Sequence, residues 1–150
     1  ARKKGVKIVL NPGNRELVQK EKLIDNLSRL TALILNCEEA DKLGIFKKSG
    51  QTEILVITDG RRGACLYTDK ISLNASSFES PVIDETGAGD SFSAGFVAGL
   101  VKGVSLEVAL KMGMANGASC VSQIGAKTAL LDEEEMALWL KKNLQIEKII

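Results

Sequence analysis

Residues 84–92 read Asp-Glu-Thr-Gly-Ala-Gly-Asp-Ser-Phe, and this stretch decides how the second half of the chain folds. The glycine-rich turn leads directly into a run of helical period, in which Phe92 and Phe96 fall on one face. The first N–H groups of a helix have no partner within the helix and carry a partial positive charge. Because Gly87 and Gly89 lack side chains, these N–H groups can come close to a phosphate. The stretch therefore predicts an anion hole at the start of a helix.

Asp90 falls in the first turn of the same predicted helix. A carboxylate in that position is stabilised as the anion, so it is suited to accept a proton. A structural explanation stands beside the functional one, because an acidic residue in a first turn often only complements the helix dipole. Two familiar phosphate motifs are excluded, since no Gly-Lys-Ser/Thr follows and the third glycine of the dinucleotide fingerprint is missing.

The amino-acid composition excludes several kinds of partner and of catalytic mechanism. The 150 residues are 45% hydrophobic and 26% charged with a net charge of +1, which indicates a globular protein without a nucleic-acid or membrane partner. No run approaches the ~20 apolar residues that span a bilayer. The sequence has no His, which excludes Ser-His-Asp and Cys-His mechanisms and most zinc enzymes. Cys37, Cys65 and Cys120 are odd in number and widely spaced, so we expect a reducing, cytoplasmic setting.

Strand-like and helix-like patterns alternate along the chain, which predicts an α/β fold with parallel strands. The expected strands lie at 6–10, 32–35 and 54–57, and segments 64–67 and 71–73 are expected to return as antiparallel partners. The expected helices lie at 21–30, from Glu38 to near Gly44, from Thr86 to Gly103, from Ser105 to about Val121, and at 132–142. No internal repeat occurs, so a single domain of residues 1–150 is the simplest organisation.

The pattern Asp84-x-Thr86-Gly-Ala-Gly-Asp90-x-Phe92 resembles the second signature of ribokinase-like (PfkB-type) carbohydrate kinases. Other segments resemble that family in the same order along the chain. They are Asn11-Pro12, Asn36-Cys37-Glu38-Glu39-Ala40 as an Asn-x-x-Glu motif, Thr58-Asp59-Gly60-Arg61-Arg62-Gly63 as a nucleotide turn, and Gly125-Ala126. The resemblance implies a Rossmann-type three-layer α/β/α sandwich and an ATP-dependent phosphotransferase that acts on an alcohol group.

Members of that family are considerably longer than this chain. The resemblance therefore implies that residues 1–150 are a C-terminal fragment, the nucleotide-binding and catalytic portion, without the lid and the first strands. We expect such a chain to phosphorylate sugars poorly when isolated, because groups that position the substrate and exclude water are missing. A homodimer is possible in the full-length protein.

Carried over by position, the resemblance assigns a role to each matching residue. Asp90 is implied as the general base, with Gly87, Ala88 and Gly89 holding the transferring phosphoryl group. Asn36 is implied to lie near the nucleotide phosphates, and Glu39 to organise Mg²⁺ through water. The other residues implied to contact ATP are Thr58, Gly60, Arg61, Arg62, Gly63, Met114 and Asn116. Those implied for a monovalent cation such as K⁺ are Asp84, Thr86, Cys120, Gln123 and Gly125.

Each assignment has a simpler alternative. Asn36 could cap a helix that begins at Cys37, and Glu39 could complement its dipole. Thr58–Gly63 could be an ordinary hairpin turn, and Cys120 a small buried hydrophobic residue. At the level of function, a nucleoside kinase of the same fold and a non-catalytic nucleotide-binding or interaction domain stay open beside the sugar kinase.

Overall fold

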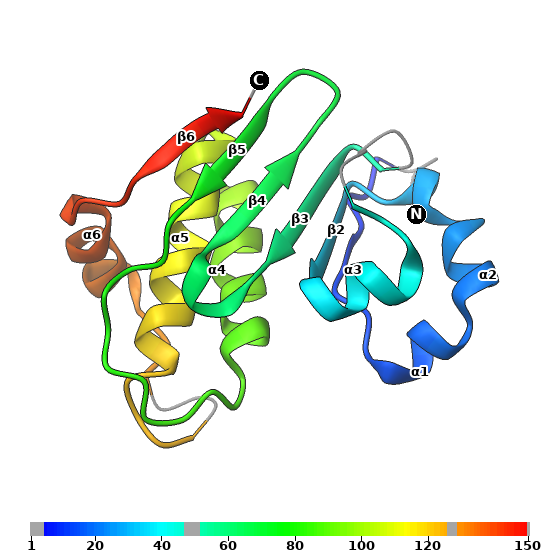
Figure 1. Ribbon diagram of the computed structural model, residues 1–150. Coiled ribbons are helices and arrows are strands. Elements are labelled where there is room, and N and C mark those ends of the chain that lie inside the picture. Colours follow the sequence, from blue (N-terminus) through cyan, green and yellow to red (C-terminus); the bar gives the residue numbers. More distant parts are fainter. Residues whose placement is uncertain (1–4, 47–51, 126–128, 150) are drawn as a thin grey trace. The chain divides into compact units, whose positions relative to one another are not determined.

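The computed structural model describes residues 5–46, 52–125 and 129–149. The chain divides into two compact units, one made of Ala1–Gly60, Ala64–Asn74 and Lys148–Ile150, the other of Arg61–Gly63 and Ala75–Glu147. In the described residues the strands form one sheet in the order β1-β2-β3-β4-β5-β6 (Figure 1). The single-domain organisation expected from the sequence stays a prediction.

In the first unit, the sheet begins with parallel strands. β1 (Val9–Leu10), β2 (Ala32–Asn36) and β3 (Ile54–Thr58) are parallel, and β4 (Ala64–Tyr67) returns antiparallel to β3. The first four residues of both β2 and β3 are buried, as the near-continuous apolar runs of parallel strands require. Three expected strands and the antiparallel return are therefore confirmed, although β1 is shorter than residues 6–10.

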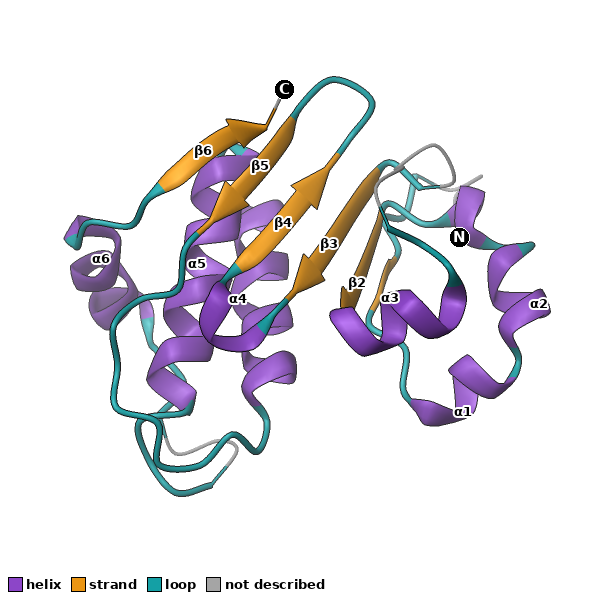
Figure 2. Cartoon of the chain, in the orientation of Figure 1, coloured by secondary structure: helices purple, strands orange, loops and turns teal. Residues whose placement is uncertain are grey.

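The helices of the first unit are short (Figure 2). They are α1 (Asn14–Val18), α2 (Lys20–Ile24), the 3₁₀ turn η2 (Leu27–Arg29) and α3 (Cys37–Leu43). The continuous helix expected at 21–30 is wrong, because α2 stops where the Asn26 side chain donates to the Lys22 carbonyl at 2.7 Å. An Asn side chain that bonds the backbone in this way competes with the helical ladder. This segment still buries Leu23, Leu27 and Leu30, in a core that also contains Leu33, Leu35, Leu43, Leu55 and Ile57.

The second unit is built around α4 (Ala88–Lys102) and α5 (Leu106–Cys120), which lie side by side (Figure 1). α4 ends at Gly103, whose φ of 70° is the left-handed conformation that glycine favours at a helix end. α5 begins after Ser105, whose hydroxyl accepts a hydrogen bond from the Val108 N–H at 3.2 Å. Both helix boundaries expected from the sequence are confirmed.

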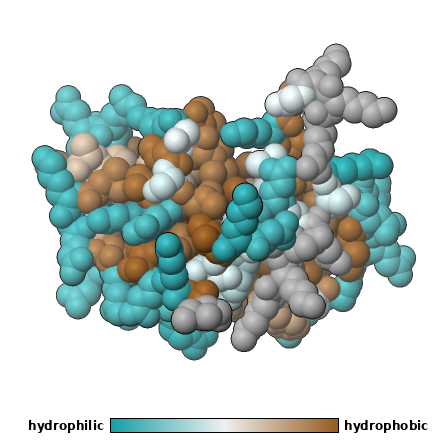
Figure 3. All heavy atoms as spheres, turned by 90° about the horizontal axis from the view of Figure 1, so that it is seen from above, coloured by the Kyte–Doolittle hydropathy of each residue, from teal (hydrophilic) through white to brown (hydrophobic). Residues whose placement is uncertain are grey.

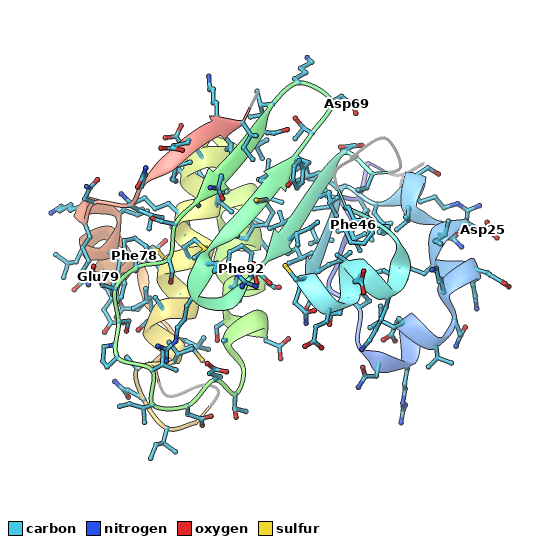
Figure 4. All side chains as sticks on the ribbon, in the orientation of Figure 1. Asp25, Phe46, Asp69, Phe78, Glu79 and Phe92 are labelled. Atoms are coloured by element: carbon cyan, nitrogen blue, oxygen red, sulfur yellow. The ribbon has the colours of Figure 1, made fainter. Side chains whose placement is uncertain are left out.

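The last helix, α6 (Glu133–Lys141), is held by contacts at both ends and on one face. Asp132 caps its start by accepting from the Glu135 N–H at 2.8 Å. Lys111 of α5 donates to the Leu140 and Lys142 carbonyls at its end, at 2.9 and 2.7 Å. Trp139 meets Phe78 edge to face with ring centroids 5.1 Å apart, and Phe78 is labelled in Figure 4. These contacts make the sole tryptophan a reporter on the second unit.

Strands β5 (Ser72–Ala75) and β6 (Ile146–Ile149) complete the sheet. Large apolar side chains also reach the surface, among them Val18, Val101 and Ile124 at 86%, 81% and 78% exposure. On the face drawn in Figure 3, hydrophobic residues appear between hydrophilic ones. Among the described residues, no helix combines the length and apolar character needed to cross a membrane.

Candidate active site

The glycine-rich turn folds into the N-terminus of α4, as the sequence predicts. Gly87 is the N-cap residue and has φ 80°, a left-handed conformation that side-chain-bearing residues rarely adopt. The Ala88 N–H donates to the Glu85 carbonyl at 3.2 Å. Among the described residues, no group accepts a hydrogen bond from the N–H of Gly89 or of Asp90. Two adjacent amides are therefore available to an anion.

Gly89 is a glycine that the fold itself does not require. It is exposed and lacks the positive φ of Gly87. A Cβ atom added at Gly89 would meet nothing within 4 Å. Glycine inside a helix costs about 1 kcal/mol relative to alanine. The position thus gives up helix stability without any gain in packing, which is understandable if a ligand approaches the backbone closely.

Asp90 is exposed, and among the described residues no donor or cation is bonded to its carboxylate. It follows Gly89 directly, so the carboxylate and the two available amides belong to a single helical turn. An exposed carboxylate with open acceptor positions can take a proton from a bound hydroxyl. The turn therefore combines an acceptor for a proton with donors for an anion.

Asp84 ties this turn to the segment that follows α5. Its Oδ1 accepts from the Thr86 N–H at 2.9 Å, and its Oδ2 accepts from the Gly125 N–H at 3.1 Å. The hydrogen bonds with Thr86, and then that with Gly125, hold the pKa of Asp84 below its ordinary value. The Ile83 N–H donates to the Val121 carbonyl at 2.7 Å, which adds a further hydrogen bond between the segment before α4 and the segment after α5.

The residues that the resemblance implies for a monovalent cation lie in this linked region. The Cys120 thiol donates to the Thr86 carbonyl at 3.6 Å, and the Gln123 N–H donates to the Cys120 carbonyl at 3.5 Å. No described group of three or more His, Cys, Asp or Glu residues could hold a metal ion. The donors here are one carboxylate and backbone carbonyls, which suit a hard cation better than a transition metal. Ala126, which completes the matching pair with Gly125, lies outside the described residues.

In the first unit, Asn36 and Thr58 are paired neighbours at the carboxyl ends of β2 and β3. This edge is where open α/β sheets bind ligands. Asn36 also caps α3: its Oδ1 accepts from the Glu39 N–H at 2.9 Å, and Glu39 Oε2 accepts from the Asn36 N–H at 2.8 Å. The capping role proposed as the simpler alternative is confirmed, and contact with phosphate or Mg²⁺ stays a prediction for both residues.

The remaining candidates for ATP contact differ in their surroundings. Gly60 and Gly63 both have positive φ, 51° and 103°. Gly63 is also required by packing, because its Cβ would lie 1.9 Å from the Ala75 carbonyl oxygen. The 3₁₀ turn η3 (Gly60–Arg62) exposes both arginines. Met114 is buried, with 6% of its surface exposed.

Asn116 is a buried amide whose two ends are already bonded. It is 5% exposed, its Nδ2 donates to the Ser91 carbonyl at 2.7 Å, and its Oδ1 accepts from the Leu131 N–H at 3.0 Å. The family resemblance implied a role for this residue at the nucleotide, and no local sequence pattern pointed to these backbone partners. Contact with ATP stays a prediction for Asn116.

Comparison with known proteins identifies the family. Residues 2–133 match the family described as pfkB family carbohydrate kinase. The chain is 39% identical over 102 residues to inositol 3-kinase of Zea mays, covering 68% of this chain and 27% of that protein. It is 30% identical over 152 residues to ribokinase of Haemophilus influenzae, covering 94% of this chain and 49% of that protein. The chain thus spans about half the length of these relatives or less.

Comparison with solved structures is consistent with this family match. The nucleoside kinase of Methanocaldococcus jannaschii, an archaeal member of the ribokinase family, matches with a TM-score of 0.82 and 29% identity, covering 91% of this chain and 48% of that one. The Burkholderia thailandensis nucleoside kinase in complex with inosine matches over 91% of this chain and 48% of that one, with a TM-score of 0.82. At 24% identity the latter bears on the fold alone. These matches confirm the ribokinase-like α/β fold predicted from the sequence, and the chain belongs to the pfkB family of carbohydrate kinases.

Proposed function

We propose that this chain carries the ATP-binding and catalytic portion of a kinase that transfers phosphoryl groups to an alcohol of a sugar or related compound. One observation supports the proposal most: the exposed Asp90 carboxylate and the available amides of Gly89 and Asp90 share the first turn of α4. Phosphoryl transfer needs a group that orients and deprotonates the acceptor hydroxyl, and donors for the charge on the phosphoryl oxygens.

In the proposed reaction, the oxygen of the acceptor hydroxyl attacks the γ-phosphorus of ATP. As that P–O bond forms, the hydroxyl proton passes to an Asp90 carboxylate oxygen, and the bond from the γ-phosphorus to the bridging oxygen breaks to release ADP. The amides of Gly89 and Asp90 would donate to the phosphoryl oxygens while their charge redistributes. Gly87 and Ala88 would set the direction of these amides by fixing the start of α4.

The proposal assigns nucleotide and Mg²⁺ contacts to the carboxyl edge of β2 and β3. Glu39 uses Oε2 in the α3 cap, and its Oε1 has no bonded partner among the described residues. That oxygen suits a water-mediated contact with Mg²⁺, which would supply charge neutralisation to the ATP phosphates. Asn36 and the segment from Thr58 to Gly63 would contact the nucleotide, and the linked loop of Asp84, Thr86, Cys120, Gln123 and Gly125 would hold K⁺ if one is used.

A nucleoside kinase of the same fold is the second candidate. It is favoured by the match to the Methanocaldococcus jannaschii nucleoside kinase over 91% of this chain. A binding domain without catalysis is disfavoured, since it would have no use for an exposed acid beside two open amides. We further propose a cytoplasmic setting without a nucleic-acid partner, in keeping with the net charge of +1.

Replacement of Gly89 by Ala tests the proposal. The added methyl group meets no atom within 4 Å, so the folded state should be as stable as before or more stable by up to about 1 kcal/mol. The same methyl group would stand beside the amides and obstruct a phosphate, so we expect kcat/KM for ATP to fall about 10-fold or more in the complete protein.

The matched control is Gly117→Ala, which adds a methyl group to another helical glycine. Its Cβ would make ordinary contacts at 3.5 Å from the Ala88 carbonyl and 3.6 Å from Phe92 Cβ. This variant should keep its stability, because both distances are ordinary van der Waals contacts, and it therefore controls for the effect of an added methyl group on the helix. Full activity of Gly89→Ala in an ADP-release assay would count against phosphate binding at this turn.

A further inference from the structure

The first turn of α4 rests on one short stretch of α5. A Cβ at Gly113 would lie 2.9 Å from the ring of Phe92, which Figure 4 labels. A Cβ at Gly117 would come within 3.5 Å of the Ala88 carbonyl. Asn116 lies between these two glycines and bonds the Ser91 carbonyl at 2.7 Å. Residues 113–117 of α5 thus support the helical turn that contains Asp90.

Asn116 reaches the first turn of α4 from a buried position on α5, through a side-chain hydrogen bond. Met112 and Ala115 of α5 and Phe96 of α4 are also buried. A buried side-chain amide without hydrogen-bond partners would lower the stability of the fold by about 1–3 kcal/mol. The hydrogen bonds of Asn116 therefore restrict the position of the backbone groups that they join. The donor end is fixed on Ser91, the residue after Asp90, and the acceptor end on the Leu131 N–H.

We infer that Asn116 is a positioning residue for phosphoryl transfer, which fixes the rotation of the first α4 turn and so the direction of Asp90. The inference rests on the proposed function for its kinetic consequence. Ser91 follows Asp90 directly, so a shift of the Ser91 carbonyl turns the Asp90 peptide with it. Van der Waals contacts between smooth apolar surfaces allow small rotations, whereas a 2.7 Å hydrogen bond has a directional optimum.

The leading test is Asn116→Leu, which keeps a similar volume and removes both hydrogen bonds. In the complete protein we expect kcat to fall about 10²-fold, as misplacement of a reacting group does, with the Kd for ATP unchanged. Hydrogen exchange should become about tenfold faster or more at the Leu131 and Ser91 amides, the first because it loses its acceptor and the second because its turn loosens.

Asn116→Asp tests the two hydrogen bonds separately. It also keeps the inference testable if the Asn116→Leu variant does not fold. Its carboxylate still accepts from the Leu131 N–H but cannot donate to the Ser91 carbonyl when ionised. Leu131 should stay protected from exchange, while kcat falls as in Asn116→Leu. The control Ser105→Ala removes a hydrogen bond at the other end of α5 and should leave kcat and both exchange rates unchanged.

Two results would overturn the inference. Weaker ATP binding with unchanged kcat would place Asn116 at the nucleotide instead. Wild-type exchange rates at Ser91 and Leu131 in Asn116→Leu would show that the side chain fixes neither segment. Absence of kinase activity in the wild-type protein would defeat the proposed function, and the exchange rates would still decide whether Asn116 holds the turn.

Discussion

Replacement of Asp90 by Asn is expected to lower kcat of the complete protein by about 10²-fold or more, the usual effect of losing a positioned base. The amide has nearly the same shape as the carboxylate but cannot take the hydroxyl proton at neutral pH. Asp90 is exposed and bonds no described side chain, so the loss of stability should stay within about 0.3–1 kcal/mol, the size of its interaction with the helix dipole. Steady-state ADP release at saturating ATP and acceptor measures the effect.

The matched control for Asp90 is Glu85→Gln in the same turn. Glu85 is also exposed, and its contribution to the turn is a backbone carbonyl that the substitution leaves in place. This variant should keep a kcat close to that of the wild type. An Asp90→Asn variant with near-normal kcat would require the base to be another residue.

Replacement of Gly95 by Ala is expected to produce the largest loss of stability. A Cβ at Gly95 would lie 2.6 Å from the Met112 carbonyl oxygen and 3.0 Å from Asn116 Cβ. The first contact is with backbone inside a helix, which cannot move aside without separating α4 from α5. Overpacking of this kind costs about 1–3 kcal/mol or more and outweighs the gain in helix propensity of about 1 kcal/mol.

Chemical denaturation followed by Trp139 fluorescence measures this loss, because the sole tryptophan lies in α6 of the same unit. Gly117→Ala serves again as the control, and its denaturation midpoint should equal that of the wild type or exceed it. Equal midpoints for Gly95→Ala and the wild type would mean that the two helices are not in such close contact.

Helix boundaries could be predicted wherever a local residue determines them. Ser105, Gly103 and Asp132 act through hydrogen bonds or backbone conformations within one turn, so their effect is visible in the sequence. The helix α1 was missed because it follows Asn11-Pro12-Gly13, which reads only as a turn. β6 was missed because a four-residue edge strand depends on a partner distant in sequence.

The site shows the same division between local and distant information. Gly87 and Gly89 look alike in the sequence, and only the structure shows that the backbone conformation requires glycine at position 87 while nothing in the fold requires it at position 89. The links from Asp84 to Gly125 and from Asn116 to Ser91 join segments that no sequence period relates. The order of motifs along the chain predicted the family, and the physical roles of these links needed the structure.

The amides at the start of α4 are the groups proposed to bind the transferring phosphate. We propose titration of the isotope-labelled complete protein with a non-hydrolysable ATP analogue in the presence of Mg²⁺, with backbone amide signals observed by NMR. The signals of Gly89 and Asp90 are expected to move more than those of any other residue of α4, because these N–H groups gain phosphate oxygens as acceptors. Unchanged Gly89 and Asp90 signals at saturation, with shifts elsewhere, would contradict the account.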